Sequence, residues 1–107
     1  MAQLSVQKLS LSGISPSFTA AASGGDTFKN YGKTILHVKN DGSSEVTVTV
    51  ASNPCEYGEN HDVEVSIPAG EERQIGNFDQ NRFNDDGYLV SVSYSSVSSV
   101  TVAAIQY

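Results

Sequence analysis

The 107-residue chain contains one cysteine and no tryptophan, and the single cysteine already excludes several classes of protein. Cys55 has no partner for an intramolecular disulfide, so the chain is not a disulfide-framework domain. A zinc site needs three or four closely spaced ligands, and the only such cluster, Cys55, Glu59 and His61, lacks a second cysteine. We therefore expect no metal and no cofactor, and a single domain that folds on its hydrophobic core alone.

Basic residues are also scarce. Six lysines and arginines stand against twelve aspartates and glutamates, which gives a formal net charge of −6. Because phosphate groups and anionic membrane surfaces repel such a chain, we expect it to bind neither nucleic acid nor membrane. No run approaches the roughly 20 apolar residues of a membrane-spanning helix. The first residues lack the basic start and apolar run of a signal peptide, so we expect synthesis and folding in a host cytoplasm.

Motifs for catalysis are missing as well. The chain contains neither the Gly-x-Ser-x-Gly turn of hydrolases nor the Gly-x-x-x-x-Gly-Lys-Ser/Thr loop that binds phosphates. His61 is followed by Asp62, but neighbouring residues on a strand point to opposite faces, so Asp62 would not orient His61. Asp79, Asp85 and Asp86 lack the spacing of a calcium-binding loop. We expect that the protein is not an enzyme and has no catalytic residues.

Valine, threonine and serine are abundant, and their pattern predicts strands. Residues branched at Cβ favour the pleated surface of a sheet, and apolar residues alternate with polar ones in short segments separated by turn signals. No segment has a helical period. The segments predict an all-β protein, an antiparallel β-sandwich of about seven to eight strands with jelly-roll or immunoglobulin-like connections. The expected strands cover residues 4–11, 34–40, 45–50, 62–67, 71–78, 88–94 and 100–107.

Glycine and proline mark the turns between these strands. The sequence Asn-Asp-Gly at residues 40–42 is a strong turn signal, and it predicts that residues 34–40 and 45–50 form a β-hairpin. Pro-Ala-Gly at residues 68–70 predicts the turn into the next pair. Gly76, inside an expected strand, indicates a bulge or a close approach between two backbones.

The beginning of the chain differs in composition from the rest. We assign residues 1–25 to an N-terminal arm or first strand followed by a loop, and residues 26–107 to the sandwich, within one domain. The alternation changes parity at Lys8, which indicates either a bulged first strand or an arm that ends before a strand begins. The loop is rich in serine, alanine and glycine, and Ile14 and Phe18 are its expected anchors.

The tyrosines allow two interpretations. They could form a platform on which a sugar stacks, or they could lie at strand rims and in a subunit interface. Tyr88 and Tyr94 share a strand face with Val90 and Val92, which favours the core or an interface for these two. The five tyrosines are Tyr31, Tyr57, Tyr88, Tyr94 and Tyr107.

Four segments resemble a pattern in small proteins of tailed-phage and prophage head-gene clusters. They are FKNYGKTILHVKN at residues 28–40, VTVTV at residues 46–50, IPAGEERQIGNF at residues 67–78, and the valine- and serine-rich residues 90–105. The resemblance implies a virion structural protein, a capsid cement or decoration protein that binds the major capsid protein on the capsid exterior, often as a trimer. It offers no catalytic residues.

Two sets of residues are candidates for the contacts that this role requires. The first segment could reach onto the shell as an added strand. The last segment has two partly apolar faces, which indicates a central strand or one covered by a second subunit. The capsid-contact candidates are Leu4, Val6, Leu9 and Leu11. The candidates for the interface of a homotrimer are Val100, Val102, Ile105 and Tyr107.

Two other functions remain open. The chain could be another virion component, at the head–tail joint or in the tail, and it could be a carbohydrate-binding sandwich. The net charge of −6 favours solubility and disfavours contact with packaged DNA, which favours a position on the outer surface of the shell.

Overall fold

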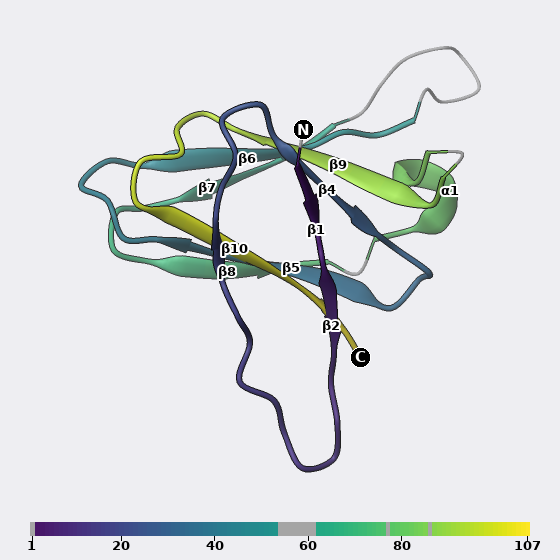
Figure 1. Ribbon diagram of the computed structural model, residues 1–107. Helices are drawn as coiled ribbons and strands as arrows, with labels where there is room; N and C mark the ends of the chain where they lie inside the picture. The colour runs from purple at the N-terminus through teal and green to yellow at the C-terminus, as the bar shows by residue number, and fades with distance from the viewer. Residues whose placement is uncertain (1, 54–61, 77, 86) are drawn as a thin grey trace.

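The structure, a computed structural model, describes residues 2–53, 62–76, 78–85 and 87–107 as a sandwich of two sheets (Figure 1). The first sheet has the order β1 (Ala2–Leu4), β4 (Asp26–Lys29), β9 (Leu89–Tyr94), β6 (Val46–Val50) and β7 (Val63–Ile67). The second sheet has the order β2 (Val6–Lys8), β10 (Val100–Gln106), β5 (Thr34–Asn40) and β8 (Glu72–Ile75), with β3 (Thr19–Ala20) also paired to β10. The predicted all-β sandwich is confirmed, with ten strands in the described residues instead of seven or eight.

The strand order distinguishes between the jelly-roll and immunoglobulin-like topologies that the sequence left open. The eight strands β3 to β10 pair only antiparallel, in the orders β3-β10-β5-β8 and β4-β9-β6-β7. Every connection among these strands except that between β6 and β7 crosses from one sheet to the other. This is the connectivity of a jelly roll. β1 and β2 are additions to it, because they pair parallel with β4 and β10.

The predicted hairpin between residues 34–40 and 45–50 is wrong. These segments are β5 and β6, which lie in opposite sheets and face each other across the core. The connection is therefore a β-arch, a turn that carries the chain from one sheet to the other. Each strand buries one face, with Leu36 and Val38 at 0% exposure on β5 and Val48 and Val50 at 0% on β6. Alternation of this kind fits face-to-face packing as well as edge-to-edge pairing, so it does not distinguish an arch from a hairpin.

A buried asparagine closes this end of the sandwich. The Asn40 side chain is fully buried, and its Nδ2 donates to the carbonyl oxygens of Ser44 at 2.9 Å and Ile67 at 3.0 Å. Its Oδ1 accepts from the backbone nitrogen of Gly42 at 3.1 Å. One amide thus satisfies backbone groups of two arches, β5–β6 and β7–β8, that leave their sheets at the same point.

Several shorter features differ from the sequence expectations. β3 and the four-residue helix α1 (Gln80–Phe83) lie in segments expected to be loops, because elements this short carry no detectable period. Gly76 makes the predicted close approach. Its φ is +147°, and a Cβ added there would lie 2.9 Å from the Cγ2 of Ile35, which is too close for an ordinary contact. β8 ends there, at Ile75. Among the described residues, no helix is long and apolar enough to cross a membrane.

The core lies between the sheets and consists mainly of valines. Phe28, Phe78 and Phe83 fill one end of it, with ring centroids 5.4 and 5.8 Å apart in the two successive pairs. β10 occupies a central position in its sheet, and both of its faces are buried in the chain. Val102 and Ala104 face the core at 0% exposure, and Ile105 on the opposite face is 5% exposed. The two apolar faces predicted for this segment are therefore both buried within the chain.

A carboxylate is buried at the edge of this core. Asp26 is 1% exposed, and its Oδ2 accepts from the Tyr94 hydroxyl at 2.7 Å and from the backbone nitrogen of Ala22 at 3.3 Å. Burial, the hydrogen bond to Asp26 and the nearby carboxylate charge raise the pKa of Tyr94 well above its usual value. The hydroxyl must therefore stay protonated for the folded state to keep this bond.

Replacing the buried amide tests the role assigned to the arches. Asn40→Ala should lower the free energy of unfolding by about 3 kcal/mol, because it leaves buried carbonyl oxygens and one backbone N–H without partners. Urea denaturation measures the change. Asn81→Ala, at an exposed position on α1, is the matched control and should change it by less than about 0.5 kcal/mol. Equal effects of the two substitutions would show that Asn40 does not hold the arches.

Alkaline pH tests the Tyr94–Asp26 bond. The pKa of Tyr94 is raised in the folded state, so folding is stabilised below the unfolded pKa of about 10 and loses this contribution as the pH rises above it. The pH range to scan, about 9 to about 11.5, brackets the pKa of about 10 of an unperturbed tyrosine. Across this range, the free energy of unfolding should fall more steeply in the wild type than in Tyr94→Phe. Tyr107→Phe, at an exposed position, should follow the wild type. Parallel curves for wild type and Tyr94→Phe would refute the coupling.

Candidate functional site

The acidic residues and histidines singled out in the sequence are the first to consider as possible metal ligands. Within them, no group of three or more histidine, cysteine, aspartate or glutamate side chains is placed to hold a metal ion. Asp79 accepts from the backbone nitrogen of Asn81 at 2.8 Å as the N-cap of α1. The Oδ1 of Asp85 accepts from the nitrogen of Gly87 at 2.8 Å. The cluster Cys55, Glu59 and His61, and also Asp86, lie outside the described residues.

The first segment of the chain is a pair of short strands that joins both sheets. β1 pairs with β4, Ser5 follows, and β2 then pairs with β10, so the chain passes from one sheet to the other along their edge (Figure 1). Leu4 is 9% exposed and belongs to the core, and the partly buried Val6 packs against it. These two capsid-contact candidates therefore pack within the chain itself, as an ordinary first strand does.

The loop between β2 and β3 extends beyond the end of the sandwich (Figure 1). Its tip is an ordered turn, because the Gly13 nitrogen donates to the Ser10 carbonyl at 3.0 Å and the Ser10 hydroxyl donates to the Gly13 carbonyl at 3.1 Å. Gly13 has φ +86°, which favours glycine. Leu11 lies in this turn, fully exposed, and Leu9 at the base of the loop is 47% exposed. These are the two capsid-contact candidates that face solvent.

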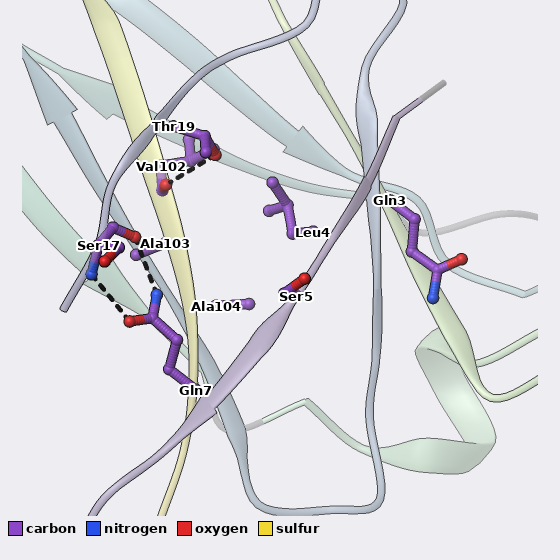
Figure 2. A pocket seen from close by; sticks show the side chains of 9 residues that line it. All are labelled: Gln3, Leu4, Ser5, Gln7, Ser17, Thr19, Val102, Ala103 and Ala104. Atoms are coloured by element: carbon purple, nitrogen blue, oxygen red, sulfur yellow. Dashed lines mark hydrogen bonds between the residues drawn. The ribbon is translucent and has the colours of Figure 1, made fainter.

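Two contacts hold the base of this loop. The Gln7 side chain donates from Nε2 to the Ser17 carbonyl at 2.8 Å, and its Oε1 accepts from the Ser17 nitrogen at 2.8 Å (Figure 2). The amide thus pairs with the backbone of Ser17 much as a neighbouring strand would. The Phe18 and His37 rings form a T-shaped pair with 5.1 Å between centroids, and the Lys39 Nζ lies 4.1 Å from the centroid of the Phe18 ring. Phe18 is therefore one of the two anchors that the sequence predicted, and Ile14, the other, is half-buried.

A cavity of about 300 Å³ lies where β2 and β3 separate along β10 (Figure 2). Leu4 and Val102 form part of its apolar wall, and Thr19 and Gln7 contribute polar groups. Thr19 Oγ1 donates to the Val102 carbonyl at 3.5 Å. The first segment therefore covers the edge of β10 only in part, because β2 meets its second half and β3 its first half.

Phe18 packs on His37 and Lys39, whose side chains lie on the outer face of β5. His37 Nε2 lies 2.9 Å from Glu72 Oε1, and the His37 side chain is 12% exposed. Lys39 on the same strand places its Nζ over the Phe18 ring. His37 thus has a structural role in seating the loop, and its hydrogen-bond partners among the described residues are Glu72 and Gln74.

The candidates for a subunit interface are mostly buried within the chain. Val100 is 1% exposed and Val102 is 0% exposed because both point into the core. Ile105 is 5% exposed on the opposite face of the same strand. Tyr107 is 50% exposed, so it is the one member of this set that a neighbouring subunit would reach directly.

Two tyrosines form an exposed pair that the strand pattern did not predict. The rings of Tyr31 and Tyr88 lie 5.6 Å apart at an interplanar angle of 35°, and the residues are 57% and 53% exposed. Tyr88 was expected to share a face with Val90 and Val92, but its backbone is left-handed, with φ +62°. Such a conformation costs a bulky residue on the order of 1–2 kcal/mol. Tyr57 lies outside the described residues, and Tyr94 is held by Asp26.

One signal in the sequence could have identified the projecting loop. Residues 9–25 contain no charged side chain in a chain that carries six basic and twelve acidic ones. An exposed, uncharged stretch with two leucines is typical of an interaction surface. The left-handed conformation of Tyr88 has no comparable signal, since tyrosine rarely adopts it.

Comparisons of the chain with protein-family models, with curated proteins and with solved structures found no match.

Proposed function

We propose that this protein is a capsid cement or decoration protein of a tailed phage or prophage, which binds the major capsid protein on the outside of the shell as a homotrimer. The proposal rests on the resemblance of residues 26–105 to small proteins of head-gene clusters and on one structural observation. That observation is the preformed, uncharged loop that carries the fully exposed Leu11 beyond the sandwich.

The geometry of the loop supports insertion into a partner. An exposed leucine on a flexible segment would lose conformational entropy on binding, which weakens affinity. Here the Ser10–Gly13 hydrogen bonds order the tip, and the Gln7–Ser17 pair holds the base. Much of that entropy is therefore lost before binding. Full burial of a leucine side chain contributes roughly 1.5–3 kcal/mol, so Leu11 serves well as an anchor in an apolar pocket.

Charge and size support the outer surface of a shell. The net charge of −6 keeps a small domain soluble by itself and opposes contact with packaged DNA. One loop offers a small interface. Three loops in a homotrimer would bind neighbouring capsid subunits together, because attachment of one loop raises the effective concentration of the other two. We place the exposed Tyr107 in the contact between protomers.

Co-sedimentation with capsids tests the proposed contact. Shells assembled from the major capsid protein of the same phage or prophage should pellet the wild-type protein saturably. Leu11→Ser should weaken this binding roughly 30-fold, the equivalent of about 2 kcal/mol for one buried leucine. Because Leu11 is fully exposed, its replacement should leave the free energy of unfolding unchanged within about 0.5 kcal/mol.

Tyr31→Ala is the matched control, since it removes an exposed apolar side chain outside the loop and should bind shells as the wild type does. Binding of Leu11→Ser at wild-type affinity would contradict the docking role of the loop. Failure of the wild-type protein to sediment with the shells would contradict the proposed function.

A further inference from the structure

The exposed pair of Tyr31 and Tyr88 presents two neighbouring aromatic faces to solvent. The centroids are 5.6 Å apart and the rings are inclined by 35°, so they form a slightly twisted platform. Each residue is more than half exposed, which is unusual for two large aromatic side chains in contact. Neither ring lines the cavity under β1 and β2 or the serine-rich hollow between the β5–β6 and β9–β10 turns.

The backbone turns Tyr88 outward against the alternation of its strand. Val90 and Val92 on β9 are buried, so strand parity would also place Tyr88 in the core. Its left-handed φ of +62° breaks that parity and brings the ring beside Tyr31. Strained conformations of this kind persist where the surrounding structure enforces them, and they gather at binding and catalytic sites.

Hydrogen bonds hold the backbone of Tyr88 and of the two residues that flank Tyr31. The Asn30 nitrogen donates to the Tyr88 carbonyl at 2.8 Å, and the Tyr88 nitrogen donates to the Asp85 carbonyl at 3.1 Å. The Gly32 nitrogen, next to Tyr31, donates to Asn30 Oδ1 at 2.9 Å. Asn30 is fully buried, and its Nδ2 donates to Asn84 Oδ1 at 2.9 Å. A ligand would thus meet a preorganised backbone.

The chemistry around the platform selects its ligand. The next outward-facing positions on β4 and β9 carry Lys29 and Leu89, then Thr27 and Ser91, which are paired across the two strands. Aromatic faces stack on the C–H faces of pyranose rings, and hydroxyl side chains bond sugar hydroxyls. The net charge of −6 disfavours nucleotides, which also stack on aromatic rings. We propose that Tyr31 and Tyr88 bind a pyranose ring of a neutral polysaccharide, a property independent of the proposed attachment to capsids.

Native affinity electrophoresis tests this directly, because the net charge of −6 carries the protein toward the anode. Gels would contain one of four soluble neutral polysaccharides: laminarin, hydroxyethyl cellulose, galactomannan or dextran. At least one should retard the wild-type protein. Tyr31→Ala and Tyr88→Asn should each weaken the retardation at least tenfold, and asparagine tolerates the left-handed backbone at that position, which keeps the fold intact. Tyr88→Phe, which retains the ring, should keep most of it.

One control variant separates this site from the projecting loop. Leu11→Ser removes the proposed capsid contact, and it should be retarded as the wild type is. If the wild-type protein migrates in all four gels as it does without polysaccharide, the proposal is overturned. Retardation that Tyr31→Ala and Tyr88→Asn leave unchanged would also overturn it.

Tyrosine fluorescence tests for the competing ligand class, and it can be measured directly because the chain has no tryptophan. A decaproline peptide could quench the tyrosine fluorescence of the wild type but not of Tyr31→Ala. If it does, and no polysaccharide retards the protein, the polysaccharide proposal is overturned in favour of a proline-rich partner.

Discussion

The fold depends on satisfying the backbone at the two ends of the sandwich, where the chain crosses between sheets. A hairpin keeps its turn inside one hydrogen-bonded ladder. An arch leaves the ladder, so backbone N–H and C=O groups beside the core lose their ladder partners. Asn40 satisfies such groups of two arches at one end. Asn30 and Asn84 do so at another, where Asn84 Nδ2 donates to the Asn30 carbonyl and Asn30 Nδ2 donates to the Phe78 carbonyl at 3.0 Å. Within the described residues, no buried side-chain nitrogen or oxygen is left without a partner.

Alternation of apolar residues predicted the strands of the sandwich well. β5, β6, β7, β9 and β10 begin and end within one residue of the predicted ranges, because each buries one face on the core or, in β10, both. Pairing was not predictable in the same way. The chain bends at residues 42–44, but it makes an arch and not a hairpin turn. The Asn40 amide bonds across to the carbonyl of Ile67 at the end of β7, a contact distant in sequence. Tertiary hydrogen bonds of this kind leave no mark on the local pattern.

The candidate sites show the same division. The sequence identified Leu9 and Leu11, which face solvent, together with Leu4 and Val6, which the core takes up because β1 and β2 complete the edges of both sheets. Parity placed Tyr88 on the face of Val90 and Val92, in the core or an interface, and its left-handed backbone places it outside the core. The structure therefore has two distinct exposed features, and the proposed contacts are assigned to them. One is a projecting, uncharged loop stiffened at its tip and base, and the other is a rigid aromatic pair held by the Asn30–Asn84 network.

The most direct test of the account is cryo-electron microscopy of shells saturated with the protein, assembled from the major capsid protein of the same phage or prophage. We predict added density on the outer surface in groups of three copies, with the turn at Leu11 against the shell and the two-sheet body outside it. Density in which residues 9–17 point to solvent, or shells that bear no added density, would contradict the account.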